Sequence, residues 1–129
     1  MILVDTNVLL DVLQEDVDWC EWSQGQLNSA NALVINPIIY AELSIGFARI
    51  EELEAIINEA SLAFEHPPRE ALFLAGKAFV RYRRSRGTKS SVLPDFYIGA
   101  HAAVMQWPLL TRDVRRYRTY FPTVSLIAP

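Results

Sequence analysis

Apolar and polar residues follow one another along this chain in blocks that predict strands succeeded by helices. Met1–Val4 is an apolar run with the length of a short strand, and Asp5-Thr6-Asn7 after it is typical of a strand end and a helix cap. The apolar residues that come next are spaced as on one face of a helix: Val8, Leu9, Val12 and Leu13. The chain is therefore predicted to begin with a strand and a helix.

The same alternation continues to the end of the chain. Further strands are predicted at Ala32–Ile35, Leu62–Phe64, Pro108–Thr111 and Val124–Ile127. Further helices are predicted at Asp16–Leu27, from Pro37, at Ile50–Ala60, at Pro94–Met105 and at Asp113–Tyr120. A long helix is predicted after Pro68, with Leu72, Ala75, Phe79 and Tyr82 on one face, ending near Arg86-Gly87. Strands that alternate with helices indicate an α/β fold, with a central parallel sheet of four or five strands covered by helices on both faces.

Size and composition fit one domain over residues 1–129. Hydrophobic residues make up 51% of the chain, which is enough for one core, and the length leaves no room for a second. Cys20 is the only cysteine, which excludes an intrachain disulfide and a thiolate zinc cluster. No apolar run approaches the ~20 residues of a membrane span, and the first residues lack the basic region of a signal peptide. We expect a soluble, cytoplasmic protein with no membrane partner.

Charge is distributed unevenly between the two halves of the chain. Residues 1–65 hold twelve acids and one base, whereas residues 66–129 hold three acids and eleven bases, so that the net charge of -3 conceals two opposite halves. This polarity favours a nucleic acid or another polyanion as partner of the basic half. The alternative, left open here, is that the two halves of one globule attract each other.

Isolated carboxylates stand in three otherwise uncharged apolar stretches. They are Asp5 in Met1–Leu10, Glu42 in Ala32–Ala48 and Asp95 in Ser90–Thr111. An ionised carboxylate is costly to bury unless it is paired, hydrogen-bonded or bound to a cation. The pattern therefore indicates that these acids meet at a site.

A fourth acid, Asp113, follows the predicted strand Pro108–Thr111, as Asp5 follows the first strand. Ligands of open α/β sheets collect at the carboxyl ends of the strands, near the point where the strand order reverses. Glu42 lies about a turn and a half into the helix after the second strand, and Asp95 lies in the first turn of the helix opened by Pro94. All four side chains are thus able to face one crevice.

Four carboxylates in one crevice repel one another, and a divalent cation relieves the repulsion. An all-oxygen ligand set favours Mg²⁺ or Mn²⁺, whereas zinc prefers histidine or cysteine. Water on such an ion is more easily deprotonated, and the ion also neutralises charge on a phosphoryl oxygen. The reaction that suits this site best is hydrolysis of a phosphodiester bond.

Each acid also has a purely structural interpretation. Asp95 at a helix start is able to interact with the helix dipole, and Asp113, in the charged run Thr-Arg-Asp-Val-Arg-Arg, is able to cap a surface helix. Glu42 lies in mid-helix among apolar residues, where the alternative is a buried pair with an arginine.

The four acidic segments resemble the motifs of a known family. Asp5-Thr6-Asn7-Val8, Glu42 within Ile-Ile-Tyr-Ala-Glu-Leu, Pro94-Asp95-Phe-Tyr-Ile-Gly-Ala-His-Ala and Leu-Leu-Thr-Arg-Asp113 look like the four acidic motifs of the PIN-domain ribonucleases. The length and the Ala-His-Ala ending of the third motif look most like VapC, the toxin of VapBC toxin–antitoxin systems. The resemblance covers essentially the whole chain.

This resemblance implies a Mg²⁺- or Mn²⁺-dependent endoribonuclease. It implies that Asp5, Glu42, Asp95 and Asp113 hold the metal ion at the catalytic site, and supporting hydrogen bonds are implied for Thr6, Asn7 and Thr111. It also implies a homodimer that is inhibited by a cognate VapB-like antitoxin, whose tail occupies the active-site groove. A housekeeping PIN nuclease has the same motifs. The sequence therefore does not separate it from a toxin, because that distinction depends on the neighbouring gene.

Half of the twelve bases fall between Lys77 and Lys89. One interpretation is a phosphate track that leads RNA to the acids, and the other is a solvated helix end whose bases complement the dipole. The candidate RNA-binding residues are Arg81, Arg84, Arg86, Arg112 and Arg115. Of these, Arg112, directly before Asp113, is expected to lie nearest the substrate.

Other polar and aromatic residues are given structural roles. Asp11 is predicted to be solvated, and His101, about 240° around the helix from Asp95, is predicted to be packed and hydrogen-bonded away from the metal. Trp19 and Trp22 are able to line a partner groove, although aromatic residues three apart on a helix are more often part of a core.

Two other classes of function are weighed against the nuclease. The first is an RNA-binding module of the same fold without catalysis. The second is a phosphoacceptor signalling domain, which needs a lysine after a late strand, and no lysine follows Lys89. Neither a Walker loop nor a Gly-x-Gly-x-x-Gly segment is present, which speaks against a nucleotide cofactor.

Overall fold

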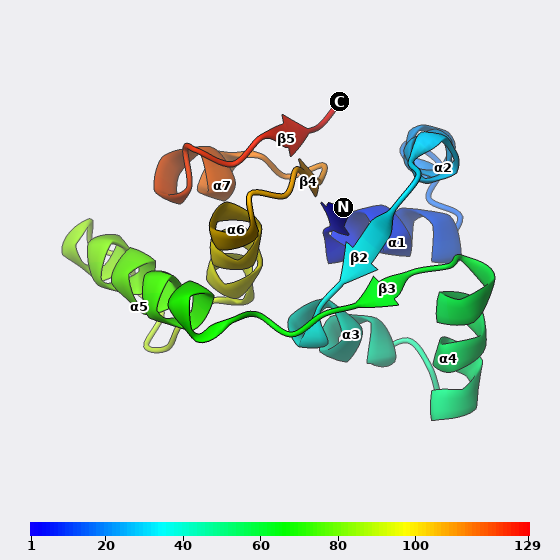
Figure 1. Cartoon of the computed structure of the whole chain (residues 1–129), viewed down its shortest axis with the longest axis horizontal. Coiled ribbons are helices and arrows are strands. Elements are labelled where there is room, and N and C mark those ends of the chain that lie inside the picture. Colours follow the sequence, from blue (N-terminus) through cyan, green and yellow to red (C-terminus); the bar gives the residue numbers. More distant parts are fainter.

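The computed structural model describes residues 1–129 and contains five strands and seven helices (Figure 1). The strands are β1 (Ile2–Val4), β2 (Leu33–Ile35), β3 (Ala63–Phe64), β4 (Leu109–Leu110) and β5 (Leu126–Ile127). The helices are α1 (Thr6–Leu13), α2 (Cys20–Ser29), α3 (Pro37–Ser44), α4 (Ile50–Glu59), α5 (Arg69–Arg84), α6 (Pro94–Met105) and α7 (Arg115–Tyr120). The predicted alternation of strands and helices is confirmed.

All five strands pair in parallel in the order β3-β2-β1-β4-β5. β1 is the middle strand, with Leu3 beside Val34 of β2 and beside Leu109 of β4. From β1 the chain builds the sheet first toward β3 and then, after α5 and α6, toward β5. The strand order therefore reverses at β1, and the carboxyl end of β1 is the switch point at which ligands of such sheets bind.

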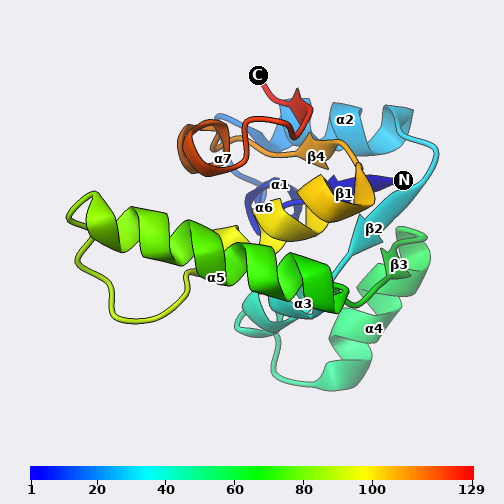
Figure 2. The same cartoon turned by 60° about the vertical axis from the view of Figure 1, so that its left-hand side comes forward.

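Helices cover the sheet on two sides. Figure 1 shows α1, α2 and α4 on one side of the strands and α5, α6 and α7 on the other, and the turned view in Figure 2 shows α5 lying along α6. The core between them is apolar, and Leu3, Val4, Val34 and Ile35 in the two central strands are fully buried. No helix is both long enough and apolar enough to cross a bilayer.

Short polar caps start the helices that surround the switch point. The Asp5 carboxylate accepts the backbone N–H of Thr6 at the start of α1, and the Asn36 amide oxygen accepts that of Ile39 at the start of α3. Pro37 and Pro94 occupy first-turn positions of α3 and α6, where a missing N–H costs nothing. The two side-chain caps fix where the segments that carry Asp5 and Glu42 leave the sheet.

The starts of two helices and one helix face differ from the sequence prediction, and several other element ends are shifted by one or two residues. α2 begins at Cys20 instead of Asp16, because the Asp16 carboxylate accepts the N–H groups of Asp18 and Trp19 and holds residues 16–19 as a turn. α7 begins at Arg115 instead of Asp113. On α5 the core face consists of alanines 71, 75 and 78, whereas Leu72, predicted to share one face with Ala75, is 46% exposed.

Candidate active site

Asp5 occupies the carboxyl end of the middle strand and is only 5% exposed. Its Oδ1 accepts the Thr6 N–H at 2.8 Å, while its Oδ2 accepts the hydroxyls of Thr111 at 2.8 Å and Tyr117 at 2.9 Å. The Asn7 amide nitrogen lies 3.4 Å from the same Oδ2. Every one of these donors is uncharged, so the carboxylate is well hydrogen-bonded but has no cationic partner.

The surroundings of Asp5 favour its protonated form. Burial raises the pKa of Asp5 from 3.8 to about 6, and repulsion by Asp95 adds to the rise, although the hydrogen bonds from Thr111, Tyr117 and Thr6 oppose it. Asp5 is thus harder to ionise than an ordinary aspartate, and positive charge nearby would lower its pKa again.

Tyr117 of α7 connects Asp5 to Asp95. Its side chain is buried, its hydroxyl donates to Asp5, and Asp95 Oδ1 lies 3.5 Å from the same hydroxyl oxygen. Burial and the nearby carboxylates of Asp5 and Asp95 raise the pKa of Tyr117 well above 10, so that the hydroxyl remains a donor. Sequence reasoning missed this residue, because nothing in the sequence distinguishes Tyr117 from the other aromatic residues.

Asp95 lies in the first turn of α6, with a side chain that is 33% exposed. Burial raises its pKa; Arg116, whose Nη1 lies 3.5 Å from Oδ2, lowers it, and Asp113 and Glu42 raise it further. The net effect is that the pKa of Asp95 is raised. The single long contact with the partly exposed Arg116 therefore does not offset the burial of Asp95 and its repulsion by the other acids. Asp95 is therefore repelled by Asp113 and Glu42, and its own charge raises the pKa of Asp5.

Glu42 on α3 reaches the site through Thr6. The Thr6 hydroxyl donates to Glu42 Oε1 at 2.6 Å, and Thr6 directly follows Asp5 on the chain. No arginine pairs with Glu42, so the alternative of a buried ion pair is wrong. The side chain is half-buried and keeps an oxygen free for a ligand.

Asp113 is exposed in the loop between β4 and α7, and it caps no helix, since Val114 precedes α7 without a side-chain cap. Its backbone N–H donates to the Thr111 hydroxyl oxygen at 3.1 Å. Asn7 holds the same loop, because its Nδ2 donates to Thr111 Oγ1 at 3.3 Å and its Oδ1 accepts the Arg112 N–H at 3.1 Å. The supporting residues Thr6, Asn7 and Thr111 therefore join the segments that carry Asp5, Glu42 and Asp113, whereas Asp95 is linked to them through Tyr117.

The acids offer oxygen ligands and excess negative charge, which is the chemistry that Mg²⁺ or Mn²⁺ requires. No three acidic, histidine or cysteine side chains are arranged to hold one ion directly. Mg²⁺ is usually bound through only one or two carboxylates and keeps several waters. The pair joined by Tyr117, Asp5 and Asp95, fits such an ion, with Glu42 and Asp113 around it.

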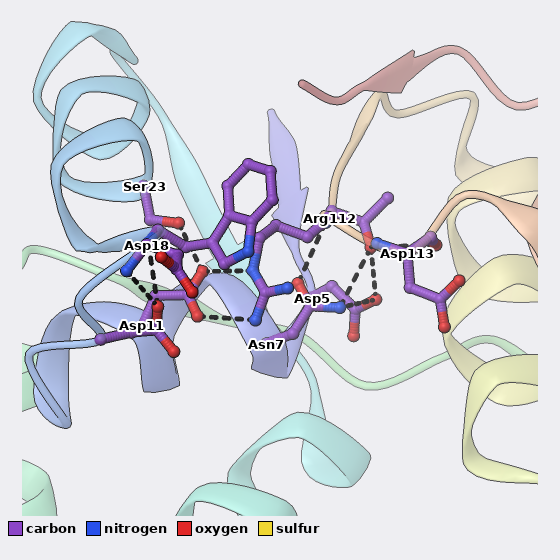
Figure 3. Close-up of polar contacts among 10 residues, drawn as sticks. Asp5, Asn7, Asp11, Asp18, Ser23, Arg112 and Asp113 are labelled. Atoms are coloured by element: carbon purple, nitrogen blue, oxygen red, sulfur yellow. Dashed lines mark hydrogen bonds and ion pairs between the residues drawn. The ribbon is translucent and has the colours of Figure 1, made fainter.

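A second network ties the β4–α7 loop to α1 (Figure 3). Arg112 Nε and Nη2 donate to the two carboxylate oxygens of Asp11 at 2.6 and 2.7 Å, and Ser23 of α2 donates to the same carboxylate at 2.7 Å. The Arg112 guanidinium also lies 5.2 Å from the centre of the Trp19 ring. The loop that carries Asp113 is thus held from α1 and α2.

The prediction that Asp11 is solvated is wrong. α2 packs over the face of α1 that carries it, and the residue is 3% exposed. Burial opposes the charge of Asp11, but the hydrogen bonds from Arg112 and Ser23 outweigh it and lower its pKa. Arg112 is engaged in this pair, and its predicted contact with RNA stays a prediction.

The other candidate RNA-binding residues lie at the end of α5 and on α7. Arg81 Nη atoms lie 3.4 Å from the carbonyl oxygens of Thr119 and Tyr120, whereas Arg84, Arg86 and Arg115 are exposed. His101 is fully buried beside Asn36, at 3.2 Å through Nδ1, as the prediction of a packed histidine requires. Burial lowers the pKa of His101 to about 4.

Comparisons with known proteins agree with this architecture. The family model described as PIN domain matches residues 2–122. No curated protein matches the chain in sequence.

Several solved structures are similar over nearly the whole chain. A VapBC2 structure from Rickettsia felis, bound to a promoter DNA fragment, has a TM-score of 0.73 at 19% identity and covers 100% of this chain and 99% of its own. The structure of VapBC-1 from nontypeable Haemophilus influenzae has a TM-score of 0.74 at 19% identity, and the match covers 99% of this chain and 98% of that one. A toxin–antitoxin complex from Klebsiella pneumoniae has a TM-score of 0.69 at 21% identity, and the match covers 96% of this chain and 95% of that one.

The pair of Asp11 and Arg112 generates a test of stability. We expect Asp11→Asn to lower the free energy of unfolding by about 2 to 3 kcal/mol, because it removes a buried carboxylate and leaves the partly buried Arg112 guanidinium without its counter-charge. The control is Glu51→Gln, which removes an exposed ion pair with Arg49 and should cost under about 0.5 kcal/mol. Urea unfolding of the variants measures both, and equal effects of the two substitutions would contradict this account.

The raised pKa of Asp5 predicts a pH dependence in metal-free buffer. Between its unfolded value of 3.8 and its folded value of about 6, the folded state holds a proton that the unfolded state has released. Stability should therefore fall by about 3 kcal/mol as pH rises from 4 to 6 and then level off. Asp5→Asn should remove this component, as shown by urea unfolding at several pH values with EDTA. Parallel pH profiles for the two proteins would disprove the burial argument.

Proposed function

The chain belongs to the PIN domain family, and on that premise we propose that it is a Mg²⁺- or Mn²⁺-dependent endoribonuclease, the toxin of a toxin–antitoxin pair. The observation that carries this proposal is the buried carboxylate of Asp5 at the switch point of the sheet. It has a raised pKa and shares Tyr117 with Asp95. A cation at this place removes the electrostatic cost of both acids.

In this proposal the four acids hold the metal, because carboxylate oxygens are the ligands that Mg²⁺ and Mn²⁺ prefer. Asp5 and Asp95 share the Tyr117 hydroxyl, and Glu42 and Asp113 add negative charge near Asp95. A divalent ion bound here supplies an activated water and neutralises charge on the phosphate.

The protein's own residues have orienting and binding roles in this proposal. Thr111 and Tyr117 hold the Asp5 carboxylate in one orientation, and Thr6 holds Glu42. Arg115 and Arg116 on α7 provide positive charge for the RNA backbone. Neither histidine serves as a general base in this proposal. His101 is buried and has a lowered pKa, and His66 follows β3, whereas Asp5 and Asp113 follow β1 and β4.

We propose that the antitoxin, whose tail is expected in the active-site groove, also contacts an apolar hollow whose lining contains none of the four acids. An apolar hollow of about 420 Å³ lies between α1, α2 and α4, and its walls include Leu9, Leu13, Leu27 and Ile56. An amphipathic helix binds such a groove through residues at helical spacing. The similar VapBC and toxin–antitoxin structures support a partner of this kind.

A homodimer is proposed on the outer face of α5. Phe73 is 69% exposed and Val80 is 40% exposed, and the two lie on one stripe opposite the buried alanines of this helix. Light scattering on the purified chain measures the oligomeric state.

Catalysis is tested with RNA and purified protein freed of any antitoxin. We expect cleavage with Mg²⁺ or Mn²⁺, loss of activity in EDTA, and a loss of more than about a hundredfold in Asp5→Asn and Asp95→Asn, since each removes a charge that the reaction needs. Glu52→Gln, an exposed acid on α4 outside the site, is the matched control and should keep full activity.

The outcome separates this function from its alternatives. Activity that survives chelation would refute the metal-dependent mechanism. RNA binding without cleavage over a full metal titration would instead identify a non-catalytic module of the same fold. A small antitoxin reading frame next to the gene, whose product relieves growth arrest, distinguishes a toxin from a housekeeping nuclease.

A further inference from the structure

A second hollow adjoins the acids on the side of α5 and α7. Its volume is about 510 Å³, and it is lined by Tyr82, Asp113, Arg115, Arg116, Thr119 and Tyr120. Pockets of about 300 to 1,000 Å³ are typical of small-ligand sites. Because Asp113 belongs both to this hollow and to the set of acids, a ligand in it lies next to the proposed point of cleavage.

Two tyrosines form the aromatic wall of this hollow. The ring centroids of Tyr82 and Tyr120 lie 6.5 Å apart, and both rings pack edge-on against the buried ring of Phe96. The Tyr82 hydroxyl accepts the backbone N–H groups of Thr88 and Lys89, each at 3.1 Å. Gly87 lies so close to the Tyr82 ring that a Cβ there would collide with it. The aromatic wall is therefore fixed in place before any ligand arrives.

Arginines form the charged wall. Arg115 is exposed and its side chain makes no ion pair or hydrogen bond. Arg116 makes only the long contact with Asp95, and its guanidinium lies 5.9 Å from the centre of the Tyr82 ring. Behind Tyr120, Arg81 lies 5.5 Å from the ring centre. Positive charge and aromatic surface thus meet at one place.

We propose that this hollow is a nucleotide subsite, which holds an RNA nucleotide next to the scissile phosphate. The base lies against Tyr82 and Tyr120, and its phosphate lies on Arg115 and Arg116. This inference rests on the proposed function and adds the residues that hold the nucleotide beside the acids. Bases stack on aromatic side chains only when they are free of a duplex. The substrate is therefore single-stranded RNA or an unpaired loop, with tolerance for the identity of the stacked base.

Stacking is tested by RNA binding in an Asp5→Asn background, which prevents cleavage. The probe is a short single-stranded RNA that carries a fluorescent adenine analogue, whose emission is quenched on stacking. Tyr120→Leu should weaken binding about tenfold and abolish the quenching, whereas Tyr120→Phe, which keeps the ring, should retain both. Phe64→Leu is the control, because it removes a partly exposed aromatic ring from β3, outside the hollow.

The charged wall is tested with a variant that leaves the fold intact. Arg115→Gln changes an exposed residue without a partner, and it should weaken binding and reduce the slope of log affinity against log salt by about one. Arg118→Gln, on the same helix but outside the hollow, should leave the slope unchanged. If Tyr120→Leu fails to fold, the salt slope of Arg115→Gln, compared with that of Arg118→Gln, still shows whether RNA binds in the hollow.

The results distinguish the subsite from the nuclease activity. Unchanged affinity, quenching and salt slope in both variants would overturn the subsite, and so would equal affinity for a fully paired RNA duplex. If binding depends on Tyr120 and Arg115 but the unmodified protein never cleaves RNA, the subsite stands and the proposed function fails. If RNA is cleaved while both variants bind like the control, the subsite fails and the nuclease stands.

Discussion

The burial of one carboxylate, that of Asp5, at the end of the middle strand is the constraint on which the rest of this structure depends. A buried charge needs hydrogen-bond donors or a cation. The donors come from three places: the first N–H of α1, the hydroxyl of Thr111 after β4, and the hydroxyl of Tyr117 in α7. Segments more than a hundred residues apart in sequence thus meet at one side chain. The raised pKa shows that these donors do not fully offset the burial, and this residual cost is what a bound cation would remove.

The Asp-Thr-Asn run acquires a physical meaning from these contacts. Asp5 caps α1 and faces the site, Thr6 orients Glu42, and Asn7 holds both Thr111 and the backbone of Arg112. One helical turn further along, Asp11 binds the Arg112 side chain. The first helix therefore positions an acid from α3 and the loop that carries Asp113, so a change on α1 is expected to act on the site through several contacts at once.

Local sequence signals explain what could be predicted. Proline and the apolar run define α6 from Pro94 to Met105, as predicted, and the alternation of strands and helices indicates a parallel sheet whose switch point lies at Asp5. Helical spacing shows which residues share a face, but it does not show which face another helix will cover. For that reason Asp11, which α2 buries, was predicted to be solvated, and Leu72 was grouped on one face with Ala75 although only the alanine is buried. Tyr117 was missed because its role depends on the packing of α7 beside the acids, which no local pattern encodes.

The central claim is that Asp5 is destabilised as an anion by its surroundings and that a divalent ion relieves this. The most direct measurement is an NMR titration of the Asp5 carboxyl carbon with and without saturating Mg²⁺. We predict a pKa of about 6 in the metal-free protein, as its burial and its neighbour Asp95 require, and a value below the ordinary range of an aspartate when Mg²⁺ is present. An ordinary aspartate pKa that Mg²⁺ does not change would contradict the account.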